Sequence, residues 1–228
     1  MEVYFPQDGV TFTEEGHYYE LKGQRVPFSL TQAIKLAGFC RKPQSEAEAE
    51  AWAAKAKLGT KVHEYTYWLD QGEIELDDLK EYPDYYNRVL GWQQFREDFK
   101  FTPDLTMCEV PIAVKVNGCL FAMKLDAYGC IGDGDSICMA VVEKKTTANK
   151  EPSHAIQTAA QALAFKSHTE SLNLPLKRMA VYLLEEPNSA GRCYTVEPHE
   201  NRTDEKVFVA LLATLQWRLN NGLLKAAI

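Results

Sequence analysis

Residues 107–145 read MCEVPIAVKVNGCLFAMKLDAYGCIGDGDSICMAVVEKK, and this stretch decides the fold. Two turn signals, Asn117-Gly118 and the GDGDS of residues 132–136, divide it into three mostly apolar runs. Asn-Gly and Gly-Asp-Gly sequences are typical of hairpin turns. The stretch therefore predicts three antiparallel strands in a meander, over residues 107–116, 119–131 and 137–145.

Helical patterns lie on both sides of the meander. Pro27 and Ser29 predict the start of a helix, with Ser29 as its N-cap. Residues 44–71 are rich in Ala, Glu and Lys and predict a long helix that ends at Gly72, or two helices divided at Gly59. The other expected elements are a short hairpin turning at Gly23, helices over 84–99, 153–171 and 204–224, and strands over 177–186 and 192–197.

This order of elements predicts one α/β domain over residues 1–228. Its central mixed sheet contains the antiparallel three-strand meander and is flanked by helices. A helical N-terminal part is expected over about 28–100, a core over about 105–200, and a closing helix over about 204–224.

Composition limits the classes of function. The 25 Lys and Arg against 32 Asp and Glu give a net charge of −7, which argues against a broad nucleic-acid-binding surface but not against a local basic channel. No apolar stretch approaches the roughly 18 residues that a membrane span needs, and the acidic N-terminus does not resemble a signal peptide. The six cysteines include no CxxC pair, so we expect reduced thiols and a cytoplasmic protein.

Charged residues gather where the third strand of the meander ends. Period-two alternation places Glu143 and Lys145 on one face of this strand and Lys144 on the other. Asp126, in the preceding strand, faces Glu143 if the connecting loop is loose or a bulge intervenes. Two such carboxylates bind a hard cation such as Mg²⁺, which activates water and neutralises charge on a phosphate. Lys145 would orient or deprotonate that water, so the arrangement suits hydrolysis of a phosphodiester.

Simpler interpretations of these residues stay open. An acid and a base at a strand end also form ordinary solvated ion pairs. Glu109, on the neighbouring strand, is a further candidate metal ligand or a member of a fold-stabilising pair. His154 is expected to be a cap-region residue. The candidate phosphate contacts are Lys124, Lys144, Thr146, Thr147 and Lys150. A group of this kind is equally typical of an ordinary solvated surface.

The order of these residues resembles the PD-(D/E)XK nuclease superfamily, in its RecB-like and phage-exonuclease branch. That family has a restriction-endonuclease-like core: a helix, a three-strand meander, a helix and a strand. Its second strand supplies an Asp, its third Glu/Asp-x-Lys, and the following helix a Gln. The matching residues are Asp126, Glu143-Lys144-Lys145 and Gln157, with Gly59 and His63 of GTKVHEY as the upstream G-x-x-x-H.

The resemblance covers about residues 17–186 and implies a set of roles. His63, Asp126 and Glu143 would hold the metal, with the backbone carbonyl of Val142 or Lys144. The catalytic residues would be Asp126, Glu143, Lys145 and Gln157. Lys145 would assist the attacking water, and Gln157 would orient it.

The chain departs from the family pattern in two places. The family usually has a small residue, often Gly, two or three places before the Asp, whereas here Ala122 and Met123 precede Lys124. Gln161 stands where the family has Tyr. Neither change removes a metal ligand. Only Cys193 lies downstream of the meander, so no iron–sulfur cluster is expected.

The activity that the resemblance implies is a Mg²⁺- or Mn²⁺-dependent deoxyribonuclease, more an exonuclease than an endonuclease. It would process DNA ends in recombination or repair for a phage or prophage, in the host cytoplasm. The expected partners are linear DNA ends, double- or single-stranded, a single-strand annealing protein and further copies of the chain, with no membrane. The alternatives are a catalytically idle nuclease-fold module that binds DNA or protein, and a structure- or sequence-specific endonuclease.

Overall fold

The computed structural model describes residues 1–224, without the side chains of Asp135 and Ser167. The strands are β1 (Glu2–Tyr4), β2 (Val10–Thr13), β3 (Tyr18–Leu21), β4 (Gln24–Arg25), β5 (Phe28–Ser29), β6 (Thr102–Pro103), β7 (Pro111–Val116), β8 (Cys119–Lys124), β9 (Ala127–Ile131), β10 (Cys138–Lys145), β11 (Leu176–Leu183) and β12 (Tyr194–Pro198). The α-helices are α1 (Leu30–Leu36), α2 (Glu46–Gln71), α3 (Pro83–Phe99), α4 (Pro152–Leu172) and α5 (Thr203–Asn220). Short 3₁₀ helices cover Pro6–Asp8, Leu76–Leu79 and Gly134–Ser136.

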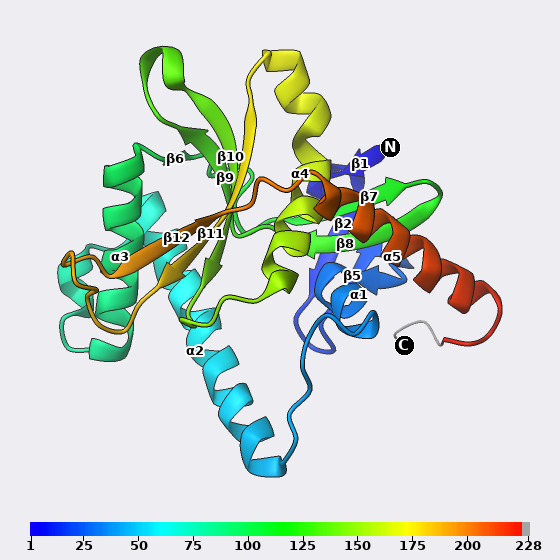
Figure 1. Ribbon diagram of the computed structural model, residues 1–228, viewed down its shortest axis with the longest axis horizontal. Coiled ribbons are helices and arrows are strands. Elements are labelled where there is room, and N and C mark those ends of the chain that lie inside the picture. Colours follow the sequence, from blue (N-terminus) through cyan, green and yellow to red (C-terminus); the bar gives the residue numbers. More distant parts are fainter. Residues whose placement is uncertain (225–228) are drawn as a thin grey trace.

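The described strands form three sheets around which the helices pack (Figure 1). The largest has the order β12-β11-β10-β9-β6 and is mixed, because β10 and β11 run parallel whereas its other pairs are antiparallel. A second sheet has the order β1-β7-β8-β5, and β2, β3 and β4 form a third. The protein is therefore α/β with mixed sheets, as the sequence predicts.

The meander differs from the predicted one in its middle strand. The run 119–131 is divided into β8 and β9, which belong to different sheets, and Leu125 and Asp126 lie between them. β8 pairs with β7, and β9 pairs with β10, so both predicted hairpins form. The prediction of a single continuous strand is wrong, and Asp126 lies at the break.

Gly129 provides a physical reason for the division. In a continuous meander, β7 would pair with the whole of the middle strand. Instead, β6 pairs with β9 along that edge, with Pro103 opposite Gly129. A Cβ atom at position 129 would lie 2.1 Å from the carbonyl oxygen of Thr102, so only glycine allows this approach.

We expect Gly129→Ala to lower the free energy of unfolding by about 1–3 kcal/mol, because the added methyl group overlaps backbone atoms. Chemical denaturation of the purified variants measures this change. Gly59→Ala is the matched control: its Cβ would meet only Oγ1 of Thr146, at 3.3 Å, and alanine favours a helix. Equal stability of the two variants would contradict this explanation of the strand break.

Two hydrophobic clusters pack on the opposite faces of β10. Met139 and Val141 face α4, where they meet Ile156, Ala160 and Leu163. The alternate residues, Ala140 and Val142, face the other way and join a cluster with Val62 of α2 and Trp92 and Phe95 of α3. This alternation continues to the end of β10, so Glu143 and Lys145 point towards α4 and Lys144 points towards α2 and α3.

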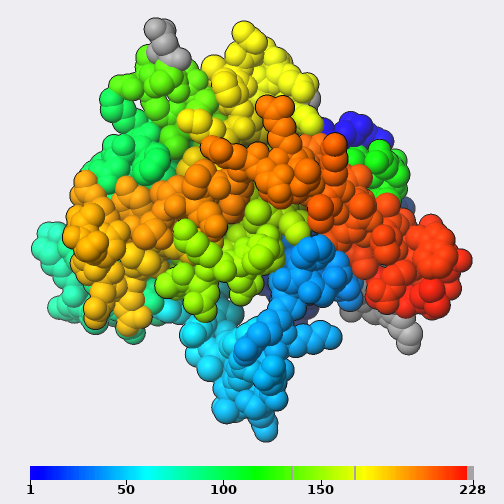
Figure 2. All heavy atoms as spheres, in the orientation of Figure 1, coloured from blue at the N-terminus to red at the C-terminus, as the bar shows by residue number. Residues whose placement is uncertain are grey.

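Helix α2 follows the N-terminal strands and α1 in the chain, and its middle part packs near the end of β10. It begins after the N-cap Ser45 and ends at Gly72, where φ is 72°, and it runs without interruption through Gly59. The alternative of two helices is therefore wrong. Residues 46–57 are almost entirely exposed and project from the rest of the molecule (Figures 1 and 2). Further along, Gly59 faces Thr146, so its missing side chain lets α2 lie against the end of β10.

The other predicted elements are present with shifted ends, whereas β1, β2, β5 and β6 were not predicted from the sequence. Ser29 caps α1 with a capping box to Gln32, and β3 and β4 form the expected hairpin at Gly23. β11 ends at Leu183, earlier than expected, and α5 ends at Asn220. The six cysteines are free thiols. None of the described helices combines the length and the apolar character needed to cross a membrane.

Candidate metal centre

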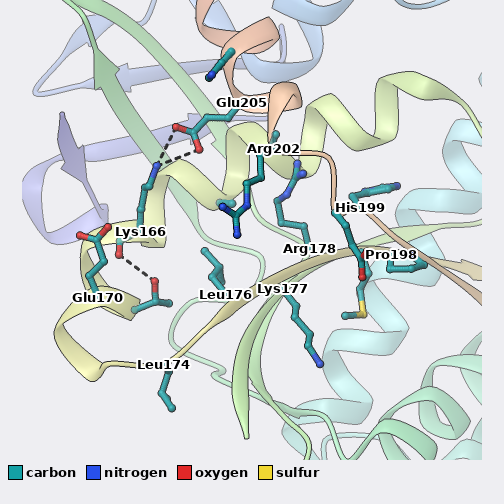
Figure 3. A pocket seen from close by; sticks show the side chains of 16 residues that line it. Lys166, Glu170, Leu174, Leu176, Lys177, Arg178, Pro198, His199, Arg202 and Glu205 are labelled. Atoms are coloured by element: carbon teal, nitrogen blue, oxygen red, sulfur yellow. Dashed lines mark hydrogen bonds and ion pairs between the residues drawn. The ribbon is translucent and has the colours of Figure 1, made fainter. Parts of the chain in front are cut away.

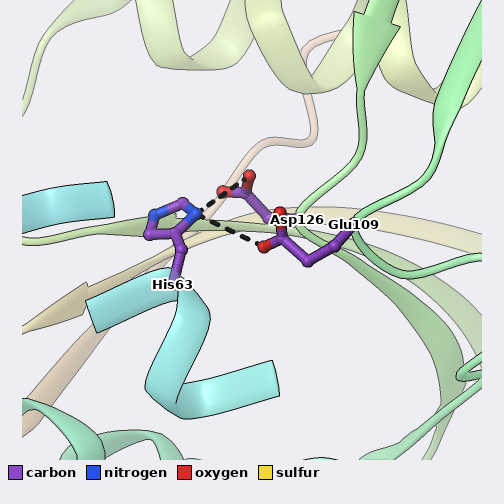
Figure 4. Close-up of side chains that lie close together, drawn as sticks. All are labelled: His63, Glu109 and Asp126. Atoms are coloured by element: carbon purple, nitrogen blue, oxygen red, sulfur yellow. Dashed lines mark ion pairs between the residues drawn. The ribbon is translucent and has the colours of Figure 1, made fainter. Parts of the chain in front are cut away.

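Three side chains with metal-binding atoms converge beside the end of β10 (Figure 4). His63 comes from α2, Glu109 from the segment before β7, and Asp126 from the break between β8 and β9. One ligand atom from each lies within 4.8 Å of the others. The group is identified by these donor atoms.

The two hairpins align the carboxylates of this group. Continuing the β7–β8 register past Pro111 and Lys124 brings Glu109 opposite Asp126. The pairing continues in this direction as a bulge, because both Glu109 and Val110 bond to Leu125: the Glu109 amide donates to the carbonyl of Leu125 at 2.6 Å, and the Leu125 amide donates to the carbonyl of Val110 at 3.4 Å. Glu109 has a φ of 56° at this bulge. Continuing the β9–β10 register past Ala127 and Val142 brings Glu143 opposite Asp126. Asp126 is thus the position at which both ladders meet.

His63 lies against both carboxylates of the group. Its Nδ1 is 3.3 Å from Oδ1 of Asp126 and 3.5 Å from Oε1 of Glu109. The three residues line a cleft of about 790 Å³, together with residues of β2, β3 and α2. The group is therefore open to solvent on one side, although Asp126 itself is buried.

Electrostatics favours the charged forms of these groups. Burial alone would lower the pKa of His63, but the carboxylates of Asp126 and Glu109 outweigh it and raise that pKa to about 9. Burial likewise opposes ionisation of Glu109, yet Lys144 and His63 hold its pKa below the ordinary value. The pKa of Asp126 is also lowered, because His63 outweighs the effect of burial.

The donor atoms fit a divalent cation. Nε2 of His63 lies 3.2 Å from the carbonyl oxygen of Lys144, so an imidazole whose Nδ1 proton is displaced by a cation would still donate there and would present its Nδ1 lone pair to that cation. Oε1 of Glu109 is buried and accepts no hydrogen bond from the described residues. One imidazole nitrogen and two carboxylate oxygens suit Mn²⁺ better than Mg²⁺, which prefers oxygen alone.

Glu143 is not a member of this group. Its Oε1 accepts hydrogen bonds from Lys145 Nζ at 2.7 Å and from Gln157 Nε2 at 2.6 Å, and its Oε2 accepts one from Gln161 Nε2 at 2.6 Å. Burial, with the charge of Asp126, raises the pKa of Glu143 despite these donors. In the structure, Asp126 groups with Glu109, a further candidate ligand from the sequence, and Glu143 bonds to Lys145, Gln157 and Gln161 beside them. The role of Glu143 as a metal ligand with Asp126 stays a prediction.

Lys145 and Gln157 lie together, as the sequence predicts. Lys145 Nζ donates to Oε1 of Gln157 at 3.0 Å as well as to Glu143. Burial would lower the pKa of Lys145, but Glu143 and Asp126 outweigh it and raise that pKa. Lys145 is therefore a protonated, partly exposed lysine held at the end of β10.

Lys144 is placed differently from its prediction as a DNA contact. Its side chain is 1% exposed, so it does not reach a DNA backbone, and that prediction is wrong. The reason is the alternation along β10, which turns the ammonium into the space between α2 and α3. Burial opposes its charge, but Glu109, Asp126 and Asp70 outweigh this and raise its pKa.

Of the other predicted phosphate contacts, Lys124 lines the cleft, and Thr146 lies against Gly59, which also lines it. Lys124 is exposed and forms an ion pair with Oε2 of Glu109 at 3.2 Å. Thr146 and Thr147 are partly exposed, and Lys150 is exposed, with its ammonium 5.7 Å from the centre of the Tyr182 ring. The carbonyl of Lys144, rather than that of Val142, is placed next to the group by its contact with His63.

Two residues of the site were not predicted. Gln161 is fully buried and bonds to Glu143, and Thr66 accepts a hydrogen bond from Lys144 Nζ at 2.9 Å. Gln161 follows Gln157 by one helical turn, and this spacing would have indicated a shared face. No comparable signal marked Thr66, because nothing in the sequence shows that Lys144 is buried.

His154 has a structural role beyond that of a cap. It is buried, with Nδ1 2.9 Å from the hydroxyl of Tyr182, and burial and the charge of Lys145 lower its pKa to about 3. In the unfolded chain its pKa is near 6.5. Between these values the unfolded state binds the extra proton, so stability falls as the pH is lowered from about 6.5 towards 3.

We expect His154→Gln to reduce this loss of stability by up to about 1.4 kcal/mol per pH unit, the value for one proton. Urea unfolding of both proteins at several pH values between 7 and 4 measures the slopes. A smaller slope remains in the variant, because the pKa of His199 is also lowered by burial. Identical slopes for the two proteins would show that His154 does not titrate in this way.

A second hollow, of about 700 Å³, lies between α4, α5 and the ends of β11 and β12 (Figure 3). It carries basic residues, but Lys166 is paired with Glu205, and Arg178 with Asp204. None of the predicted site residues lines it. The candidate site is therefore the cleft at His63, Glu109 and Asp126.

Comparisons with known proteins do not extend this description. No protein-family model matches the chain, and no curated protein is significantly similar to it.

Proposed function

We propose that the protein is a deoxyribonuclease that depends on Mn²⁺ or Mg²⁺ and hydrolyses phosphodiester bonds, acting as an exonuclease on linear DNA. The observation that carries the proposal is the convergence of His63, Glu109 and Asp126, next to Glu143, Lys145 and Gln157. The six residues come from α2, two hairpins and α4, and all lie around the end of β10.

Each residue has a role in this proposal. His63 Nδ1 and the carboxylates of Glu109 and Asp126 would hold the divalent cation, and the carbonyl of Lys144, which faces His63 Nε2, would orient the imidazole. When bound, such a cation neutralises charge on a phosphate and activates water. Lys145 donates a hydrogen bond to the phosphate or to the attacking water, and Gln157 fixes the Lys145 ammonium.

The charges of the site support an anionic substrate. Three carboxylates, Glu109, Asp126 and Glu143, are accompanied by the ammonium groups of Lys124, Lys144 and Lys145. A divalent cation added to this balanced set leaves an excess of positive charge, which attracts a phosphodiester. Local attraction of this kind operates even though the whole chain carries −7.

Other parts of the proposal rest on the sequence resemblance. They are the restriction-endonuclease-like arrangement of β7–β10, α4 and β11, exonuclease rather than endonuclease activity, and a role in recombination or repair of phage or prophage DNA. A single-strand annealing protein, further copies of the chain and a cytoplasmic location belong to the same proposal.

One observation favours a second candidate, a module that binds DNA or protein without hydrolysis. Both oxygens of Glu143 are already bonded, and each carboxylate has a cationic neighbour in the absence of metal. The charges of the site are therefore balanced without a cation, although Oε1 of Glu109 accepts no hydrogen bond from the described residues. The two candidates differ in whether added metal changes the protein's action on DNA.

The test uses linear duplex, linear single-stranded and closed-circular DNA, each with Mn²⁺, with Mg²⁺ or with EDTA. We expect release of nucleotides from linear DNA with either metal, faster with Mn²⁺ because of the imidazole ligand, and none with EDTA. Rapid nicking of the closed circle would replace the exonuclease with an endonuclease. DNA binding without hydrolysis under every condition would favour the second candidate.

A further inference from the structure

Lys144 contacts every member of the candidate metal group. Its backbone N–H donates to Oδ2 of Asp126 at 2.8 Å, and its carbonyl oxygen lies 3.2 Å from Nε2 of His63. Its ammonium nitrogen lies 3.3 Å from Oε1 of Glu109. One residue thus touches all three, from the side of the group that faces the protein interior.

The ammonium of Lys144 is fixed in a closed compartment. Nζ donates to Thr66 Oγ1 at 2.9 Å and lies 5.2 Å from the centre of the Trp92 ring, a cation–π arrangement. Trp92 is fully buried and is itself held by a hydrogen bond from Nε1 to Asp70. Because the Lys144 side chain is 1% exposed, water does not compete with its ammonium for the carboxylate of Glu109. The charge of Lys144 therefore acts on Glu109 with little screening by solvent.

From these contacts we propose that Lys144 is a built-in counter-cation of the site. It positions Glu109 towards His63 and Asp126 and supplies the positive charge that a second metal ion would otherwise bring, so the group binds a single divalent cation. The inference concerns the same site as the proposed function and rests on it for the identity of the cleft. Lys144 acts through the ligands and is a positioning residue rather than a catalytic one.

The proposal makes an unusual prediction about metal affinity. If Lys144 only supported packing, its loss would leave affinity for a cation unchanged or weaker. If it is a counter-cation, its loss removes a repelling charge next to Glu109 and increases affinity. We expect Lys144→Gln, which removes the charge but keeps a polar side chain with a hydrogen-bond donor, to bind Mn²⁺ roughly tenfold more tightly or better.

Lys124→Gln is the matched control. Lys124 pairs with the same carboxylate, through Oε2 at 3.2 Å, but its side chain is 42% exposed. Solvent screens its charge, so its removal should change the affinity for Mn²⁺ by less than roughly threefold. The comparison separates the loss of a buried charge from the loss of an exposed charge at the same carboxylate.

The experiment is a calorimetric titration of the wild type and both variants with Mn²⁺. Thermal unfolding of each protein is measured at each metal concentration. One ion per wild-type chain, tighter binding by Lys144→Gln and a larger increase of its Tm with Mn²⁺ support the proposal. If Lys144→Gln is too unstable to titrate, Lys144→Met in saturating Mn²⁺ should regain a cooperative transition that it lacks in EDTA. Two ions per wild-type chain, unchanged or weaker binding by Lys144→Gln, or no binding by any of these proteins overturns the proposal.

Failure of the proposed function gives a different result. If the wild type binds one Mn²⁺ and the variant binds it more tightly, but no DNA is hydrolysed, the nuclease proposal falls and the role of Lys144 stands. If DNA is hydrolysed while Lys144→Gln gains no affinity, the nuclease proposal stands and the role of Lys144 falls.

Discussion

Replacing Lys145 with methionine is expected to reduce metal-dependent hydrolysis of DNA by roughly 10²- to 10⁴-fold, the usual contribution of a positioned proton donor or acceptor. The substitution keeps the length of the side chain and removes only the ammonium that bonds to Glu143 and Gln157. Initial rates on linear DNA at saturating Mn²⁺ measure the change. Titration with Mn²⁺ should show that the variant still binds the metal, because Lys145 contacts none of His63, Glu109 and Asp126.

The control for this variant is Lys166→Met. Lys166 lies further along α4, and its exposed ammonium is paired with Glu205 of α5. The control variant should hydrolyse DNA at the wild-type rate. Circular dichroism of both variants verifies that the fold persists, since loss of Lys145 leaves the buried Glu143 with only glutamine donors. Equal rates for the Lys145 variant and the wild type would remove Lys145 from the mechanism.

Asp126→Asn is expected to abolish both metal binding and hydrolysis. The neutral amide keeps the shape of the side chain but is a poor ligand for a hard cation. Loss of an outer partner of a ligand already costs roughly 10- to 100-fold in metal affinity, and loss of the ligand itself should cost more. Calorimetric titration with Mn²⁺ measures the affinity directly.

Asp133→Asn is the corresponding control, because Asp133 is an exposed carboxylate in the β9–β10 turn, paired with Lys100. It should bind Mn²⁺ as the wild type does. The two variants of the site differ from each other in a useful way, since Lys145→Met separates hydrolysis from binding and Asp126→Asn removes both. Wild-type affinity in Asp126→Asn would show that the cation, if bound at all, lies elsewhere.

Much of the site's alignment was present in the sequence. The two-residue turn at Asn117-Gly118 fixes the β7–β8 register, and Glu109 and Asp126 lie equally far from it on either side. Counting from that turn would have paired them, although Glu109 was only a further candidate. The alternation of Glu143, Lys144 and Lys145 along one strand was likewise predictable from period two alone.

The burial of Lys144 could not be predicted in this way. Alternation shows that Lys144 points away from Glu143, but a lysine on that face could equally reach solvent. Its burial depends on α2 and α3, which bring Thr66 and Trp92 over that face of the sheet. The same uncertainty affected the middle strand, whose division depends on the approach of β6 to Gly129.

The sequence by itself determined the two hairpin turns of the meander, the N-cap Ser29 and the end of α2 at Gly72, because these depend on residues a few positions apart. It also determined which side chains of β10 share a face. The tertiary structure alone decided that His63 lies at the carboxylates, since its contact with Lys144 joins residues 81 positions apart. It alone decided which charges are buried, because burial depends on how distant segments pack and not on the local pattern of the chain.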